Sequence, residues 1–200
     1  YFNEVYLDLG LKFQDTFYES DFIDAGLKIK DELLAKGILK LSEGAIIADL
    51  EKYNLGVLPI IRSDGTALYP VSDLALASAK FEKYQLEESI YVVDIRQSLY
   101  FKQLFKILEL MGYKEKMTHL PYEFLTTKNG MMASRTGNVI TYKDLKDEAL
   151  TRATEEIRKR HEDWNEEKIT SVAFSLAISA MRFEMIKVSA DKVIVFDMAD

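Results

Sequence analysis

The segment Ser89-Ile90-Tyr91-Val92-Val93-Asp94, together with the stretch 97–111 that follows it, decides the fold class of this chain. Residues 89–94 form a short apolar run rich in β-branched side chains, which predicts a buried strand. Residues 97–111 carry apolar side chains at helical spacing, and Gly112 is well placed to end that helix. A buried strand that passes into an amphipathic helix is typical of an α/β fold with a parallel sheet.

The flanking sequence extends this pattern in both directions. A helix over 22–36 is expected after the capping signal Ser20-Asp21, and aliphatic runs predict strands over 44–49 and 56–62. Pro59 makes the second of these an edge or interrupted strand, and Pro70 suits the first turn of a helix that reaches about residue 84. We therefore expect a mainly parallel sheet up to about residue 140.

The two ends of the chain follow different patterns. Residues 2–11 alternate like a strand, but Gly10 favours a helix end, which is the interpretation we adopt. The pattern changes near residue 141, and helices are expected over 143–161 and 166–190, followed by an extended segment over 192–197. This change divides the chain into residues 1–141 and a helical region over 142–200.

Composition narrows the range of functions. With 26 basic and 33 acidic residues the net charge is −7, so the chain as a whole lacks the basic character of a compact nucleic-acid-binding module. There is no cysteine, and the only histidines, His119 and His161, lie far apart in sequence, so no metal site is expected. No uninterrupted run of about 18 apolar residues is present, so no membrane association is expected.

Tyr69 and Asp73 are four residues apart in the predicted helix and therefore share one face. A carboxylate beside a phenol could hold a cationic side chain, because Asp accepts two parallel hydrogen bonds from a guanidinium. The structural alternative is also open, because the helix dipole favours Asp in a first turn and Tyr is often half-buried.

Two further positions carry weaker signals. Ser63-Asp64-Gly65-Thr66 lies between apolar runs, which predicts a tight turn. Gln97 opens the helix that follows the strand over 89–94, and side chains at such a junction point toward the usual ligand crevice of an α/β sheet. An ordinary helix-terminal glutamine is the alternative interpretation.

The loop over 128–138 is the most specific segment. Lys128 and Arg135 flank small and hydroxyl residues between Gly130 and Gly137. Backbone N–H groups and cations in such a loop can stabilise the charge that grows on a leaving pyrophosphate. A solvent loop that merely caps the next helix would have a similar composition.

Taken in order, these segments resemble arginyl-tRNA synthetase, a class I aminoacyl-tRNA synthetase. The resemblance rests on residues 62–69 with Asp73-Leu74-Ala75, on residues 91–93 with Gln97 and residues 100–105, and on residues 135–140. Ala180-Met181-Arg182-Phe183 and Phe196-Asp197 resemble the segment that leads into an anticodon-binding domain.

The resemblance implies a Rossmann-type catalytic domain over 1–141 and a helical region over 142–200. It implies Mg²⁺-ATP-dependent activation of arginine and its transfer to tRNA(Arg) by a cytoplasmic enzyme that is monomeric when full length. By analogy, Tyr69, Asp73 and Gln97 bind arginine, and Lys128, Ser134 and Arg135 are catalytic. The ATP loop comprises Gly130, Met131, Met132, Ala133, Ser134 and Arg135.

Two departures from the family pattern affect these expectations. Met131 and Ser134 stand where the Lys-Met-Ser-Lys-Ser loop has its lysines, and no His-Ile-Gly-His-like signature is present. We therefore expect a fragment that cannot aminoacylate alone. The alternatives are an inactive synthetase-like binding or regulatory module and a class I synthetase of another specificity, against which Tyr69 and Asp73 argue.

Overall fold

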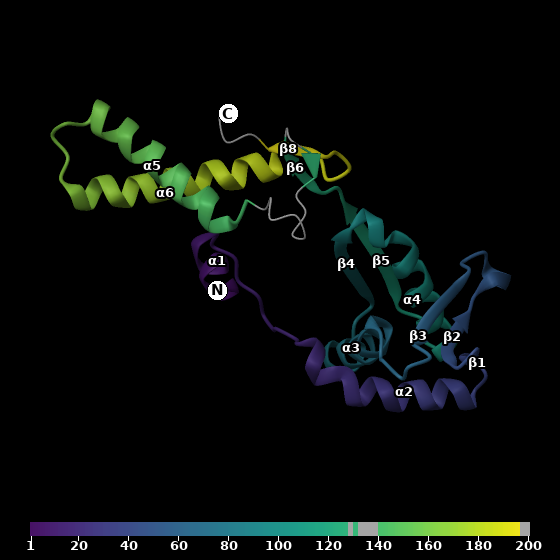
Figure 1. The fold of residues 1–200 in the computed structure, drawn as a ribbon. Helices are drawn as coiled ribbons and strands as arrows, with labels where there is room; N and C mark the ends of the chain where they lie inside the picture. Colours follow the sequence, from purple (N-terminus) through teal and green to yellow (C-terminus); the bar gives the residue numbers. More distant parts are fainter. Residues whose placement is uncertain (128–129, 132–139, 197–200) are drawn as a thin grey trace. The chain divides into compact units, whose positions relative to one another are not determined.

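The computed structural model describes residues 1–127, 130–131 and 140–196. The chain divides into two compact units, one formed by 15–121 and the other by 1–14 together with 122–200 (Figure 1). Each unit is described by itself below.

The unit over 15–121 holds most of the α/β structure. Its elements in chain order are η1 (Glu19–Phe22), α2 (Ile23–Ala35), β1 (Lys40–Ser42), β2 (Ala45–Asp49), η2 (Glu51–Tyr53), β3 (Val57–Ile61), α3 (Tyr69–Tyr84), β4 (Glu88–Asp94), η3 (Ile95–Gln97), α4 (Ser98–Met111) and β5 (Lys116–Tyr122).

The strands predicted over 44–49 and 56–62 are confirmed as β2 and β3, but they are antiparallel to each other rather than parallel. The sequence analysis also missed β1, which pairs with β2 through a hairpin. Glu43 and Gly44 both have positive φ (50° and 80°), the geometry of the tight hairpin turns that match strand twist. The edge position expected from Pro59 is confirmed, because β3 is the last strand of the order β1-β2-β3.

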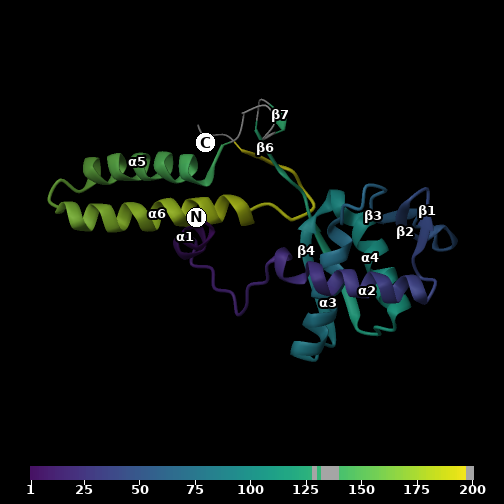
Figure 2. The same ribbon diagram turned by 60° about the horizontal axis from the view of Figure 1, so that its bottom comes forward.

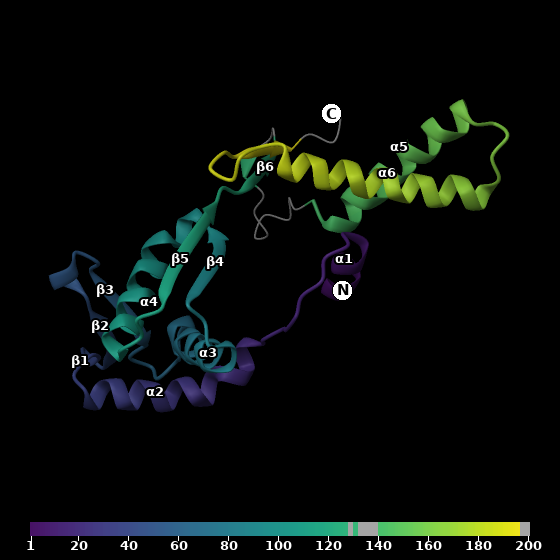
Figure 3. The same cartoon turned by 180° about the vertical axis from the view of Figure 1, so that it is seen from behind.

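The predicted parallel arrangement is found in the second sheet. Strands β4 and β5 form a two-stranded parallel sheet, and α4 connects them (Figures 1 and 3). The buried face of α4 contributes Phe101, Leu104, Ile107 and Leu108 to the main core. Tyr91 of β4 packs against this core, so the strand predicted over 89–94 and the helix after it form one layered unit.

Helices α2 and α3 approach closely at one point, where the backbone of Gly26 meets that of Val71 (Figure 2 shows α2 and α3 from below). A Cβ atom on Gly26 would lie 2.0 Å from the carbonyl oxygen of Val71. The crossing therefore requires a residue without a side chain in α2.

The helix predicted over 22–36 is confirmed as α2, with each end shifted by one residue. Residues 19–22 form a 3₁₀ turn, and α2 begins only at Ile23. The Ser20 hydroxyl donates to the Asp21 carboxylate (3.3 Å), and α2 has no side-chain cap. The expected capping signal therefore does not act on the helix.

The other unit consists mainly of a helical hairpin. Its elements are α1 (Phe2–Asp8), β6 (Leu125–Thr127), β7 (Gly130–Met131), α5 (Tyr142–Arg160), α6 (Glu166–Ile186) and β8 (Ile194–Phe196). The helix end expected near residue 10 is confirmed, as are the two long helices, which run side by side (Figure 2). Thr141 and Asp144 form a capping box at the start of α5. Strand β8 pairs with β6 in parallel.

Helix α6 is long and apolar enough to cross a membrane by length and composition alone, with a mean hydropathy of 1.4 over its best stretch. Polar residues interrupt it, which is why the sequence shows no uninterrupted apolar run. Ile169 and Ala173 of α6 are buried in a cluster with Ile157 of α5. The criterion of an uninterrupted apolar run therefore overlooked the high mean hydropathy of this helix, and the pairing with α5 covers part of it.

We predict that Gly26→Ala destabilises the unit over 15–121 by about 3 kcal/mol, because the new methyl group would force two backbones apart. The sign is diagnostic, since Gly→Ala in a helix otherwise stabilises by about 1 kcal/mol. Urea unfolding measures the difference.

The matched control is Lys28→Ala, at an exposed position of the same helix, for which we expect a change within about 0.5 kcal/mol. A Gly26→Ala protein as stable as the unsubstituted one would contradict the close approach of α2 and α3.

Candidate functional site

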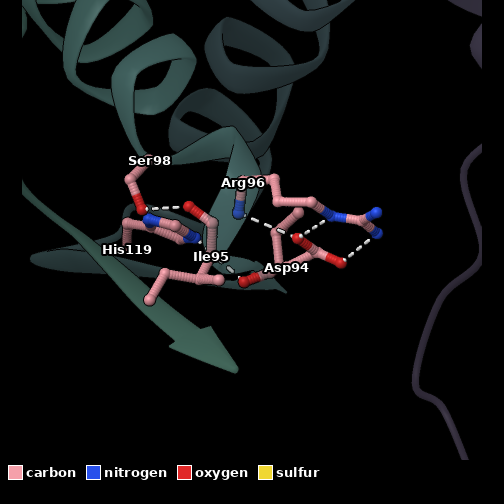
Figure 4. Close-up of polar contacts among 6 residues, drawn as sticks. Asp94, Ile95, Arg96, Ser98 and His119 are labelled. Atoms are coloured by element: carbon pink, nitrogen blue, oxygen red, sulfur yellow. Dashed lines mark hydrogen bonds and ion pairs between the residues drawn. The ribbon is translucent and has the colours of Figure 1, made fainter. Parts of the chain in front are cut away.

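The carboxyl end of β4 passes through η3 into α4, and Asp94 organises this junction (Figure 4). Its Oδ1 accepts hydrogen bonds from the backbone N–H (2.8 Å) and Nε (2.9 Å) of Arg96, and its Oδ2 accepts one from Arg96 Nη2 (2.6 Å). These hydrogen bonds from Arg96 lower the pKa of Asp94. Asp94 therefore remains ionised and fixes the turn that leads to Gln97.

His119 supports the same junction from β5. Its Nε2 lies 3.0 Å from the carbonyl oxygen of Val93 (Figure 4), and its ring stacks on Phe101 with centroids 4.9 Å apart. Nearby, the Ser98 hydroxyl donates to the carbonyl oxygen of Ile95 (2.6 Å). His119 thus has structural partners on β4 and α4, as its apolar surroundings in the sequence indicate.

Asp73 of α3 is the most distinctive group of the unit over 15–121. It is half-buried, and its Oδ2 accepts a hydrogen bond from the hydroxyl of Tyr100 in α4. Within the part of the chain that the structure describes, its Oδ1 accepts no hydrogen bond and the carboxylate forms no ion pair. Asp73 therefore has an acceptor oxygen left for a donor from outside.

The electrostatics around Asp73 favour a cationic ligand. Burial raises the pKa of Asp73, the hydrogen bond from Tyr100 lowers it, the charge of Glu19 raises it, and that of Lys80 lowers it. The net effect is a raised pKa, so the carboxylate is less well stabilised than it would be in water. A guanidinium or ammonium group bound there would offset the burial cost.

The structure places the other two predicted arginine ligands at helix starts. Tyr69 is the first residue of α3, with 70% of its surface exposed, and it precedes Asp73 by one helical turn. Gln97 is the N-cap residue of α4, is exposed, and makes no side-chain capping bond. Tyr100 follows Gln97 by one turn, so its bond to Asp73 ties the start of α4 to α3.

Tyr100 and Tyr91, which both interact with Asp73, were not predicted from the sequence as site residues. Among the described residues, the buried hydroxyl of Tyr91 has no hydrogen-bond partner, and Lys80 lies over the Tyr91 ring at 4.2 Å. Burial raises the pKa of Tyr91, the Ser89 side chain lowers it, and the charge of Asp73 raises it, with a net increase. The sequence did contain a signal for Tyr100. It is a tyrosine one helical turn after Gln97, on the helix face that carries Phe101 and Leu104.

The segment 63–66 is a tight turn, as predicted. Asp64 Oδ1 accepts from the Thr66 N–H (2.8 Å), and Gly65 has a φ of +86°. The Arg62 N–H also donates to the Thr66 carbonyl oxygen (2.9 Å). Its described contacts are those of a turn that reverses the chain between β3 and α3.

Most of the predicted ATP loop lies outside the described residues, including Lys128, Met132, Ala133, Ser134 and Arg135. The loop residues that are described, Gly130 and Met131, form β7, which pairs antiparallel with β6. The roles proposed for the loop therefore stay predictions.

Within residues 1–127, 130–131 and 140–196, no group of three or more His, Asp or Glu side chains could hold a metal ion. The candidate binding features of the unit over 15–121 are thus the half-buried carboxylate of Asp73, the starts of α3 and α4, and the tyrosines Tyr91 and Tyr100. The bond from Tyr100 to Asp73 joins the starts of α3 and α4 next to the carboxyl end of β4, the region where α/β folds bind small ligands.

Comparison with known proteins agrees with this description of an α/β ligand-binding domain. The model of the family described as the catalytic domain of tRNA synthetases class I (R) matches residues 3–198. The chain belongs to this family.

Sequence relatives are named arginine–tRNA ligase. Those from Bdellovibrio bacteriovorus and Clostridium perfringens are 36% and 34% identical over 198 residues, which is 98% of this chain in both cases. The chain covers 34% and 35% of their lengths, respectively. It therefore spans about a third of the relatives it matches.

Solved structures show the same fold. The arginyl-tRNA synthetase from Plasmodium falciparum has a TM-score of 0.79 at 21% identity and matches 98% of this chain and 33% of its own. The Thermus thermophilus enzyme has a TM-score of 0.76 at 23% identity, with 97% of this chain and 39% of its own covered. The predicted partial Rossmann-type fold with a helical region after it is confirmed.

We predict that Asp94→Asn lowers the free energy of unfolding by about 0.5 kcal/mol at pH 7, a figure reduced for the exposure of Arg96. Asn still accepts from the Arg96 N–H, so only the charge is lost. Because the folded pKa of Asp94 is lowered, its contribution is present above the unfolded value of about 3.9 and is lost as pH falls through the folded value.

Urea unfolding at pH 7 and at about pH 3 checks this, with Asp163→Asn as the control, since Asp163 is exposed and has no partner among the described residues. A difference between Asp94→Asn and the unsubstituted protein that stays constant with pH would contradict the ionic role.

Proposed function

We propose that this chain takes part in the ATP-dependent activation of arginine and in its transfer to tRNA(Arg). The observation that carries the proposal is Asp73, a half-buried carboxylate with one oxygen held by Tyr100 and the other without a donor among the described residues. The family and the names of the relatives support the same activity.

The arginine side chain is proposed to bind between the starts of α3 and α4. Asp73 accepts hydrogen bonds from the guanidinium, which matches a carboxylate in planar geometry. Tyr69 and Gln97, at the first residue of α3 and the N-cap of α4, line the same pocket. A buried carboxylate discriminates against neutral side chains, because they would leave it without a partner.

ATP is proposed to bind through the segment 130–135, which comprises Gly130, Met131, Met132, Ala133, Ser134 and Arg135. Lys128, Ser134 and Arg135 stabilise the charge that develops on the leaving pyrophosphate. Mg²⁺ enters with ATP as its complex. Support comes from the resemblance of residues 135–140 to the family's signature loop.

Domain organisation and cellular setting are proposed from the same resemblance. Residues 1–141 belong to the catalytic domain. The helical region that leads to an anticodon-binding domain begins with α5 at Tyr142 and continues to residue 200. The full-length enzyme is monomeric and cytoplasmic, works without a membrane, and takes arginine, ATP and tRNA(Arg) as substrates.

The alternative is a synthetase-like binding or regulatory module without catalysis. Met131 stands where the family loop carries a lysine, and the 200 residues contain no His-Ile-Gly-His-like signature. This alternative predicts arginine binding without turnover, so the two experiments below separate the functions.

We predict that Asp73→Asn, made in the natural full-length protein, lowers kcat/KM for arginine at least about 100-fold, because a neutral amide cannot pair with the guanidinium. Arginine-dependent exchange between ATP and pyrophosphate measures this. The free energy of unfolding at pH 7 should not fall, since the raised pKa of Asp73 means that its ionised form destabilises the folded state as pH rises above its unfolded pKa.

The matched control is Asp163→Asn, an exposed carboxylate in the other unit, for which exchange should stay within about twofold. Full exchange activity in Asp73→Asn would reject Asp73 as the arginine ligand. Binding of arginine without exchange in the unsubstituted protein would favour the module without catalysis.

We also predict that the isolated 200 residues do not charge tRNA(Arg), because these residues lack one half of the class I ATP signature and stabilisation of the transition state needs both halves. The measurement is arginylation of tRNA by the purified chain, with the full-length protein as the positive control. Detectable charging by the chain alone would overturn this expectation.

A further inference from the structure

Tyr100 makes a contact that the proposed function does not by itself require. Its hydroxyl, carried by α4, donates to Oδ2 of Asp73 on α3. Tyr100 is half-buried, and its ring packs edge-on against Phe101, a core residue, with centroids 5.3 Å apart. The phenol is therefore held in place from its own helix, and its hydroxyl in turn fixes one oxygen of the carboxylate.

The position of Tyr100 along α4 gives this bond a second consequence. Gln97 caps α4, and Tyr100 lies one turn later, so a single turn of helix carries both Gln97 and the group that holds Asp73. The aspartate side chain has two rotatable bonds, and a hydrogen bond at Oδ2 restricts rotation about both. The remaining oxygen, Oδ1, is then presented in a fixed direction.

We propose that Tyr100 is a positioning residue for the arginine site, which orients the Asp73 carboxylate so that it pairs with a guanidinium and rejects the neutral, isosteric ureido group of citrulline. This inference rests on the proposed function of Asp73 and adds a specificity determinant to it. Tyr100 acts through Asp73 and need not touch the substrate.

The groups that face Asp73 from the surrounding elements define how the site responds to pH. They are Glu19 of η1, Lys80 of α3, Tyr91 of β4 and Tyr100 of α4. Of these, Tyr100 is the one that donates a hydrogen bond to Asp73 within the described part of the chain. Its hydroxyl lowers the pKa of Asp73 against the effect of burial, so the loss of this hydroxyl moves the pKa further upward.

The chain offers a matched control in the same cluster. Tyr91 also carries a buried hydroxyl and packs on Phe101 at 5.3 Å, but that hydroxyl makes no hydrogen bond to Asp73, and the side chain that lowers its pKa is that of Ser89. Tyr91→Phe and Tyr100→Phe therefore remove the same atom from the same surroundings, with and without the bond to Asp73.

The test measures exchange between ATP and pyrophosphate as a function of arginine concentration and pH in the natural full-length protein. For Tyr100→Phe we expect KM for arginine to rise about 10-fold with kcat within about twofold, the effect of one hydrogen bond to a charged group. The acid limb of kcat/KM should move to higher pH, and inhibition by citrulline relative to arginine should strengthen. Tyr91→Phe should change neither KM nor the acid limb.

The outcomes separate this inference from the function on which it rests. Loss of exchange in Asp73→Asn, together with an unchanged KM and pH profile in Tyr100→Phe, would overturn the role of Tyr100 alone. Normal exchange in Asp73→Asn would overturn the arginine site itself. Failure of Tyr100→Phe to fold while Tyr91→Phe folds would assign the hydroxyl to stability, and that too would reject the proposal. In the Asp73→Asn background, Tyr100→Phe should produce no further shift of the pH profile.

Discussion

Burial of one face of α4 is the constraint on which the unit over 15–121 depends. Ile107 and Leu108 are completely buried, and the same face meets β4 through Tyr91. Gln103 lies on this face too, and its Nε2 donates to the carbonyl oxygen of Leu55 (2.7 Å), which satisfies a polar group that would otherwise be costly to bury. Once α4 is fixed in this way, the positions of Gln97 and Tyr100 at its start are fixed as well.

The binding chemistry follows from where that helix begins. Asp73 reaches the start of α4 from α3, a helix whose own position is set by the contact of Gly26 with Val71. The packing of α4 against the core and the close backbone approach of α2 to α3 thus determine where the carboxylate of Asp73 and the phenol of Tyr100 meet. The cost of burying Asp73 is visible in its raised pKa, and such a cost is typical of a group that is kept for binding rather than for stability.

The carboxylates of Asp94 and Asp73 differ in their hydrogen-bond partners and in the direction of their pKa shifts. Arg96 donates three hydrogen bonds to Asp94 and lowers its pKa, so both oxygens of the Asp94 carboxylate already have a donor. Asp73 has one donor and a raised pKa. Residue type alone does not distinguish the two, because both are aspartates near the start of a helix.

The sequence by itself determined the local elements and the class of the chain. Apolar patterning predicted β4 and α4, because their spacing is set by the faces that they bury, and Pro70 predicted the start of α3. A change of pattern near residue 141 predicted α5 and α6. Ordered motifs were sufficient for the family, since each is a short contiguous run. The positions of Tyr69, Asp73 and Gln97 at helix starts also followed from local signals, although their roles stay proposals.

Only the tertiary structure decided which side chains meet. The hairpin of β1 and β2 depends on positive φ at Glu43, which its residue type does not favour. The bond from Tyr100 to Asp73 joins residues 27 positions apart, and the burial of the Tyr91 hydroxyl depends on the side chains that surround it. Such contacts depend on how helices pack and on burial, and a linear pattern contains neither.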